Sequence, residues 1–262
     1  MSVVKVENGS ETVRSVNRCL DIIEFLVDNG KEASVTEISE GIGVSASTVY
    51  RQLVTLKARG YVYQNSVDSK YWLGLKFYSI GSMVKQNMPL LNFLGPHADR
   101  IAEKYKLTVF VAVPDYSSDI CAQQAIIYKK SFSPVILRNE ANVGQVMMSH
   151  GAATGKCMMS YYPKALLDRY AQYPLAKLTD KTITSWDAMM AEFETIRSLG
   201  YALDSEEEAE GKTCVAVPLV DSSGDVIASI SLSGPTRSLF QYPINEIVGD
   251  LNKAAEAVTK EL

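Results

Sequence analysis

The sequence lacks long apolar runs, and its first residues do not resemble a secretory signal. No stretch approaches the ~18 consecutive apolar residues that a membrane-spanning helix requires. Residues 1–12 are polar with mixed charge and lack the apolar centre of a signal peptide. Hydrophobic residues nevertheless make up 47% of the chain, which is enough for a sizeable core. We therefore expect a folded, cytoplasmic protein with no membrane partner.

The residues that build metal and nucleophilic sites are also scarce. Four cysteines are scattered without a C-x-x-C pair, and the only histidines are His97 and His150. A zinc site needs thiolates and imidazoles at short spacings, so we expect neither a metal site nor a cofactor. The thiols are expected to be reduced and mostly buried. Two histidines give no convincing Ser/His/Asp order, and no G-x-S-x-G elbow occurs, so the sequence does not predict an enzyme.

Two other patterns resemble catalytic motifs only in part. Residues 151–157 resemble a phosphate-binding loop, but three residues separate the glycines instead of four, and a cysteine follows the lysine. Nucleotide hydrolysis is therefore not expected. The acidic run at 204–210 could supply paired carboxylates for acid–base chemistry. Runs of acids usually form solvated loops, which is the interpretation we adopt for Glu206, Glu207 and Glu208.

Positive charge is concentrated in one short part of an acidic chain. The net charge is −4 overall. Between residues 41 and 76, however, five basic residues accompany a single acid, Asp68, for a local charge of +4. The basic residues of this window are Arg51, Lys57, Arg59, Lys70 and Lys76. A basic face on an otherwise neutral domain is typical of a module that binds nucleic-acid phosphates.

The same window has the pattern of a helix-turn-helix. Apolar residues three or four positions apart predict a first helix over 13–27. Ser34 and Glu37 have the spacing of a capping box, which starts a second, short helix. After a turn at 41–44, Ser45 starts a longer helix that ends near residue 58. Its inward-facing residues are predicted to be Val49, Leu53 and Leu56.

A hairpin follows these three helices. Residues 61–64 and 70–73 are rich in aromatic and β-branched side chains, and the polar residues 65–69 between them close a turn. Three helices and a hairpin in this order make a winged helix-turn-helix. The predicted divisions are a DNA-binding domain (1–74), its helix-turn-helix (about 34–58), its wing (61–73) and a helical linker (75–89).

The remainder of the chain, residues 90–262, mixes helical and strand patterns. Helical periodicity occurs at 90–105, 163–170, 186–199 and 242–262, and strand-like runs occur at 107–113, 120–127, 135–138, 213–220 and 226–232. Helices that flank a largely antiparallel sheet predict an α+β sensor domain.

The second helix of a helix-turn-helix lies in the major groove, with its amino-terminal residues at the base edges. Hydroxyls there can bind phosphates or bases, and Arg51 could pair with a guanine or a phosphate. The predicted DNA contacts are Ser45, Ser47, Thr48, Tyr50, Arg51 and Thr55 on the helix, and Asn65 and Lys70 on the wing. The alternative is a winged helix that binds only proteins.

Several segments of the chain resemble the IclR family of transcriptional regulators. The amino-terminal segments are TEI (36–38), SASTVYRQL (45–53), GYV (60–62) and YWLG (71–74). The carboxy-terminal segments are GYALDSEE (200–207), Gly211, CVAVP (214–218), Gly224 and SLSGP (231–235). Their order and spacing match the family from about residue 13 to the end of the chain.

This resemblance implies a GAF-like effector domain that binds a small carboxylic acid or aromatic catabolite, and a homodimer or tetramer. By position, the implied effector pocket contains Ala153, Thr154, Asp204, Cys214, Ser231 and Ser233. We expect Leu137 and Met147 to form its apolar walls. Ser231 and Ser233 alternate on one strand and so share a face. Backbone N–H groups at the helix start after Thr154 can hold an anion.

We therefore expect a ligand-responsive regulator that binds double-stranded operator DNA, in the role of repressor of a catabolic operon. Two alternatives belong to other classes. The first is a constitutive DNA-binding architectural protein whose carboxy-terminal domain only oligomerises. The second is a small-molecule enzyme with an appended DNA-binding domain, which the missing catalytic residues argue against.

Overall fold

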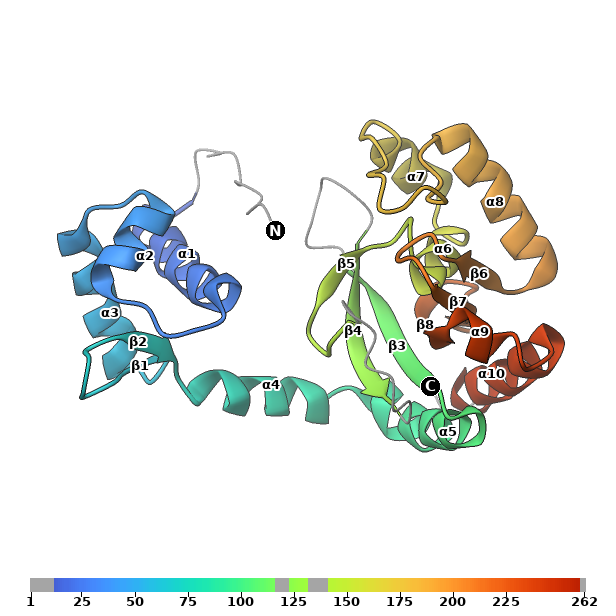
Figure 1. Cartoon of the computed structure of the whole chain (residues 1–262), viewed down its shortest axis with the longest axis horizontal. Coiled ribbons are helices and arrows are strands. Elements are labelled where there is room, and N and C mark those ends of the chain that lie inside the picture. Colours follow the sequence, from blue (N-terminus) through green and yellow to red (C-terminus); the bar gives the residue numbers. More distant parts are fainter. Residues whose placement is uncertain (1–11, 116–122, 132–140, 260–262) are drawn as a thin grey trace. The chain divides into compact units, whose positions relative to one another are not determined.

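The computed structural model describes residues 12–115, 123–131 and 141–259, and it divides the chain into two compact units, Met1–Asn87 and Met88–Leu262. Figure 1 shows the amino-terminal unit as a helical group with a small hairpin and the carboxy-terminal unit as a sheet with helices on both faces. None of the helices in the described ranges has the length and apolar character needed to cross a membrane.

The amino-terminal unit contains the three predicted helices and the predicted hairpin. Its elements are α1 (Arg14–Asn29), α2 (Val35–Ile42), α3 (Ala46–Ala58), β1 (Val62–Gln64) and β2 (Tyr71–Leu73). Ser34 caps α2 in a capping box with Glu37, as the sequence predicts. Gly43 ends α2 with φ 67°, a left-handed conformation that glycine adopts without steric cost, so the chain turns sharply into α3.

The core of this unit is apolar. The side chains of Val49 and Leu53 are fully buried, and Leu56 is 8% exposed, which confirms the predicted inner face of α3. They pack with Ile22, Leu26 and Ile38 from the preceding helices. The following helix, α4 (Lys76–Gln86), differs because none of its residues is buried.

The carboxy-terminal unit is built on a six-stranded antiparallel sheet with the strand order β5-β4-β3-β8-β7-β6. The strands are β3 (Thr108–Asp115), β4 (Gln123–Lys130), β5 (Val146–Met148), β6 (Ala202–Ser205), β7 (Lys212–Val220) and β8 (Val226–Pro235). Its helices are α5 (Pro89–Tyr105), α6 (Ala153–Met159), α7 (Lys164–Tyr170), α8 (Trp186–Leu199), α9 (Thr236–Leu239) and α10 (Ile244–Thr259). The whole chain therefore has the expected α+β architecture behind a winged helix-turn-helix.

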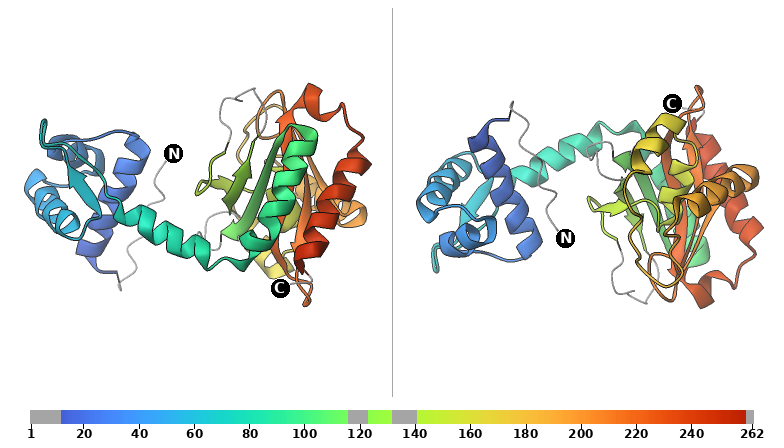
Figure 2. Two further views of the ribbon diagram at one scale, coloured as in Figure 1. Left: turned by 90° about the horizontal axis from the view of Figure 1, so that it is seen from below. Right: turned by 90° about the horizontal axis from the view of Figure 1, so that it is seen from above.

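Helices cover the two faces of this sheet in different groups, as the two views of Figure 2 show. Alternate residues of a strand point to opposite faces. Val109 and Val111 of β3 belong to the apolar cluster that includes α5 and α10. Phe110 and Ala112 belong to a second cluster, with α6, α7 and α8. The second face is the one that carries the site described below.

Sequence patterns missed three short elements of the carboxy-terminal unit. β5 and β6 have three and four residues, and α9 has four, so none of them shows a full period of apolar residues. The strand predicted at 120–127 extends further than expected, because β4 continues to Lys130. The strand predicted at 135–138 lies outside the described residues.

Candidate DNA-reading helix and effector pocket

The outer face of α3 carries the predicted DNA contacts. Tyr50 is 53% exposed, and Arg51 and Thr55 are exposed as well. At the amino-terminal end the Ser45 hydroxyl lies 3.3 Å from that of Ser47 and 2.9 Å from that of Thr48. Ser45 makes no capping bond to the α3 backbone. Its hydroxyl is therefore held by neighbouring hydroxyls at the surface, within reach of an external partner.

The wing is fastened to the loop before α2. The Asn65 side-chain amide donates to Glu32, and its carbonyl oxygen accepts from the Val67 backbone N–H. Tyr63 donates its hydroxyl proton to the same Glu32, and these hydrogen bonds hold the pKa of the Glu32 carboxyl below its ordinary value. The Asn65 amide thus shapes the wing turn. The other predicted wing contact is Lys70, whose Nζ lies 3.8 Å from Oε2 of Glu37.

A small, partly open pocket lies on the α6 side of the large sheet. Four of the predicted pocket residues line it, namely Met147, Thr154, Cys214 and Ser231. The other lining residues are Phe110, Gln124, Ile126, Ala141, Ala152, Glu208 and Lys212. The pocket is thus assembled from β3, β4, β5, β7, β8, the start of α6 and the loop before β7.

The other predicted pocket residues lie beside this lining or outside the described ranges. Ala153 is buried in α6, and its neighbour Ala152 lines the pocket instead. Asp204 and Ser233 flank Cys214 on the adjacent strands and are buried, but they do not line the pocket. Leu137 falls outside the described residues.

Sequence reasoning missed the residues that reach the pocket by strand pairing. Phe110 lies opposite Ser231 across β3 and β8, and Gln124 lies opposite Met147 across β4 and β5. Lys212 precedes Cys214 by two positions on β7, so it shares its face. That spacing was a usable signal in the sequence, whereas the cross-strand neighbours required the register.

The pocket region contains buried polar atoms that lack a hydrogen-bond partner in the described structure. They include both side-chain polar atoms of Gln124 and the hydroxyls of Ser231 and Ser233. Leaving such a group unsatisfied costs about 1–3 kcal/mol. Opposite them, Lys212 donates to Glu208 at 2.6 Å, and both side chains are largely buried. The pocket therefore combines apolar walls with hydrogen-bonding groups that a small polar molecule could satisfy.

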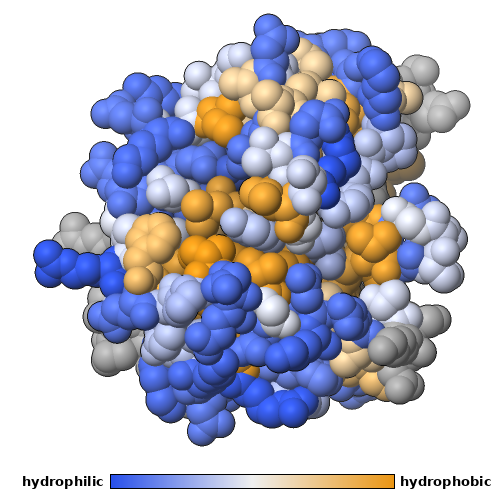
Figure 3. All heavy atoms as spheres, turned by 90° about the vertical axis from the view of Figure 1, so that its right-hand side faces the viewer, coloured by the Kyte–Doolittle hydropathy of each residue, from blue (hydrophilic) through white to orange (hydrophobic). Residues whose placement is uncertain are grey.

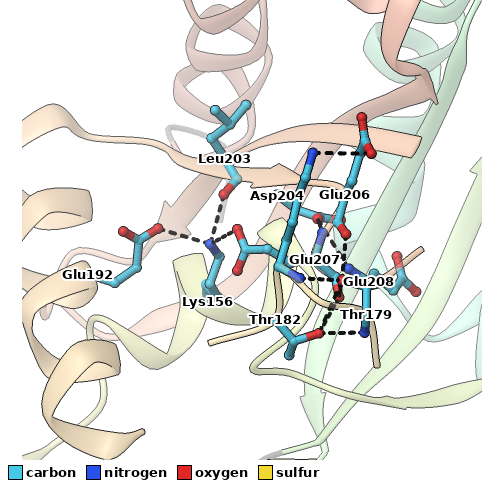
Figure 4. A network of polar contacts seen from close by, with 10 residues as sticks. Lys156, Thr179, Thr182, Glu192, Leu203, Asp204, Glu206, Glu207 and Glu208 are labelled. Atoms are coloured by element: carbon cyan, nitrogen blue, oxygen red, sulfur yellow. Dashed lines mark hydrogen bonds and ion pairs between the residues drawn. The ribbon is translucent and has the colours of Figure 1, made fainter. Parts of the chain in front are cut away.

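The acidic run is not the solvated loop that the sequence suggested. Glu207 is 8% exposed and accepts a hydrogen bond of 2.7 Å from Lys156, whose side chain is fully buried. Lys156 also donates to Glu192 on α8 and to the Leu203 carbonyl. Figure 4 shows these contacts converging on the Lys156 ammonium. The expectation was wrong because the counter-charge lies 51 residues away in the sequence.

The loop backbone is held as firmly as its side chains. Asp204 accepts hydrogen bonds from the backbone N–H groups of Glu207 and Glu208, and burial raises its pKa to about 7. Thr179 and Thr182 donate their hydroxyl protons to the Glu207 carbonyl. Asp204 is therefore a structural group at the base of the loop.

Two cysteines, Cys157 and Cys214, are buried in the carboxy-terminal unit. Burial raises the pKa values of Cys157 and Cys214 to about 12, so both remain protonated near neutral pH. In the described part of the chain no group of three or more histidine, cysteine, aspartate or glutamate side chains could hold a metal ion.

An exposed helix-turn-helix followed by a sheet domain with a small, partly polar pocket has the organisation of a DNA-binding transcriptional regulator. Family models support this class over most of the chain. The IclR helix-turn-helix domain matches residues 15–66, and the bacterial transcriptional regulator IclR C-terminal domain matches residues 83–260. The chain therefore belongs to the IclR family of DNA-binding transcriptional regulators, which are not enzymes.

Curated relatives and solved structures agree with this assignment. The transcriptional regulator KdgR of Escherichia coli K12 is 29% identical over 100% of this chain and 97% of its own. The transcriptional repressor YiaJ of the same organism is 30% identical over 95% of this chain and 88% of its own.

Among solved structures, Thermotoga maritima IclR has a TM-score of 0.74 and 28% identity, and covers 95% of this chain and 98% of its own. An IclR homologue of Microbacterium hydrocarbonoxydans, crystallised with 4-hydroxybenzoate, has a TM-score of 0.82 with 19% identity, over 95% of this chain and 98% of its own. This second likeness concerns the fold.

Proposed function

We propose that the chain represses a catabolic operon by binding double-stranded operator DNA and that a small carboxylic acid or aromatic metabolite controls this binding. The observation that carries the proposal is the pocket with unsatisfied, buried polar atoms at Gln124 and Ser231. Such atoms are costly to leave without a hydrogen-bond partner, and a bound ligand would supply one. Several relatives, among them YiaJ and AllR, are named as repressors.

In the proposed complex α3 lies in the major groove. Arg51 and Tyr50 are exposed on its outer face, and the hydroxyls of Ser45, Ser47 and Thr48 gather at its amino-terminal end. Thr55 extends the same face, and Lys70 and Asn65 belong to the wing. Arginine bidentate to guanine is the commonest specific contact in the major groove.

We further propose that the active form is a homodimer or a tetramer. Helix α4 has no buried residue, yet it exposes Tyr78, Ile80, Met83 and Val84. An isolated helix of eleven residues is marginal in water, so packing against a second copy would stabilise it. Figure 3 shows a second apolar band, on the face of the carboxy-terminal unit that carries α8 and α10.

An anisotropy titration tests the proposal. The protein is titrated against DNA from upstream of its own gene and against a scrambled duplex, at two salt concentrations, with and without a panel of organic acids. We expect tight, selective binding that weakens as salt rises. One acid should shift the binding curve, because it binds one state of the protein more tightly than the other.

Two other outcomes would contradict this function. Selective binding that no acid alters, together with no thermal stabilisation by any acid, would indicate a constitutive architectural protein. The absence of selective binding under all conditions would indicate a protein-interaction role for the winged helix.

A further inference from the structure

We propose that the Glu208 carboxylate occupies the place that the effector's carboxylate takes when it binds. Lys212 pairs with Glu208 in the free protein and with the effector in the complex. The effector is then a small monocarboxylic acid with one further polar group, which faces Gln124 and Ser231. This inference rests on the proposed function of the pocket and identifies the chemistry of its ligand.

The Lys212–Glu208 pair has the geometry of an enclosed ion site. The two charged atoms are 2.6 Å apart, and the exposed fractions of the side chains are 7% for Lys212 and 14% for Glu208. Both residues line the pocket. An ammonium has three protons to donate, and the described structure shows Lys212 donating to Glu208 alone. The ammonium also lies 5.8 Å from the centre of the Phe110 ring.

Glu208 differs from its neighbour in how it is held. Glu207 is clamped by Lys156, and its carbonyl accepts from Thr179 and Thr182. In Figure 4 the Glu207 side chain points toward Lys156, whereas the Glu208 side chain points away from that cluster. The loop backbone is therefore fixed independently of the Lys212–Glu208 bond. The Glu208 side chain can leave Lys212 by rotation about its own bonds while the loop stays in place.

The rest of the pocket restricts what can replace Glu208. Gln124 and Ser231 are fully buried, and their polar side-chain atoms have no partner, so they match a hydroxyl or carbonyl group on the ligand. Phe110, Ile126 and Met147 supply apolar walls. The pocket is small, so only a small molecule fits it. Among the described lining residues, a second negative charge would find no second lysine or arginine.

Acetate is the minimal probe for this exchange. In Glu208→Ala, Lys212 loses its partner, and added acetate should take the vacated place. We expect saturable stabilisation by acetate, with a rise in Tm of roughly 3–6 °C at saturation. Acetamide, and sodium chloride at the same ionic strength, should not produce it. The double variant Glu208→Ala/Lys212→Met should not respond to acetate.

A matched variant controls for general effects of the salt. Asp168→Ala removes the carboxylate from Lys164, a pair whose side chains are 61% and 80% exposed, and acetate should not stabilise it selectively. If Glu208→Ala does not fold, Glu208→Gln takes its place, since the amide keeps the shape and removes the charge. We then expect acetate to bind Glu208→Gln at least about tenfold more tightly than the wild type.

The proposal is overturned if folded Glu208→Ala gains no more from acetate than from chloride, or if Glu208→Gln binds acetate no better than the wild type. Equal stabilisation by acetate and acetamide would also overturn it, because the site would then not select a charge. These failures leave the proposed function intact if another ligand still releases the wild-type protein from DNA.

Discussion

The two units of the chain place their polar side chains in opposite ways. Within the described residues, every buried polar or charged residue belongs to the carboxy-terminal unit, among them Lys156, Asp204 and Glu207. The core of the amino-terminal unit is formed by apolar side chains, and Arg51 lies at the surface. A DNA-reading surface keeps its polar groups in water until DNA displaces it. A small-molecule pocket must keep its polar groups out of water before the ligand binds, and buried polar groups need hydrogen-bond partners.

The largest expected effect comes from removing the charge at the centre of the buried cluster. Lys156→Met leaves Glu207 buried without a counter-charge, and breaking such a pair costs about 3–5 kcal/mol. Calorimetry should show this loss in the carboxy-terminal unit, with the unfolding of the amino-terminal unit unchanged.

Two matched variants sharpen the test of Lys156. The double variant Lys156→Met/Glu207→Gln should recover part of the lost stability, because it also removes the stranded charge. Lys164→Met breaks a pair that is exposed on both sides, and we expect it to cost about 0.5 kcal/mol or less. Equal losses from Lys156→Met and Lys164→Met would contradict the role of burial.

Asp204 gives the stability of the carboxy-terminal unit a pH dependence that comes from burial. Burial raises the pKa of Asp204 to about 7, so the folded protein keeps a proton that the unfolded chain releases above about pH 4. This contribution is fully present below the unfolded pKa and is lost as the pH rises through about 7.

Asp204→Asn removes this titration and keeps the acceptor oxygen for the loop. Relative to Asp204→Asn, the wild type should therefore lose stability between about pH 4 and pH 7, by a total on the order of 3–4 kcal/mol. Urea unfolding of both proteins at several pH values measures the difference. A difference that does not change with pH would mean that Asp204 is already ionised at pH 4.

On the exposed side, Arg51→Ala should change DNA binding and leave stability alone. Loss of a base contact costs about 1–3 kcal/mol, a weakening of roughly 5- to 150-fold in operator affinity. Anisotropy against the operator and a scrambled duplex measures it. Arg59→Ala, at the carboxy-terminal end of α3, is the matched control and should reduce affinity less, and equally for both duplexes. Unchanged affinity in Arg51→Ala would contradict the assignment of α3 as the reading helix.

The same contrast explains what could be predicted from the sequence. The helices of the amino-terminal unit pack on an apolar core, so their sequences show apolar residues at helical spacing. Val49, Leu53 and Leu56 therefore identified the inner face of α3. Ser34 and Glu37 identified the start of α2. These signals are local and need no knowledge of the rest of the fold.

The pocket is harder to predict from the sequence, because its lining residues are distant in the sequence and come together only through strand pairing. The family resemblance indicated Thr154, Cys214 and Ser231, and Met147 was expected as an apolar wall; all four line the pocket. Gln124 lies on β4 opposite Met147 of the short strand β5, and the sequence of β5 shows no periodic pattern that would predict this pairing. From the sequence, a charged residue such as Glu207 is expected at the surface, because its partner Lys156 is not among its neighbours in the sequence.

The smallest expected effects are those of replacing two serines, each of which precedes one of two neighbouring helices. The Ser34 hydroxyl accepts from the Glu37 backbone N–H, so Ser34→Ala should destabilise the amino-terminal unit by about 1 kcal/mol. The Ser45 hydroxyl has no capping bond, so Ser45→Ala should cost less than about 0.5 kcal/mol but weaken operator binding. Urea unfolding and anisotropy on both variants separate the roles. If Ser45→Ala were as destabilising as Ser34→Ala, its hydroxyl would serve the helix and would not be available to DNA.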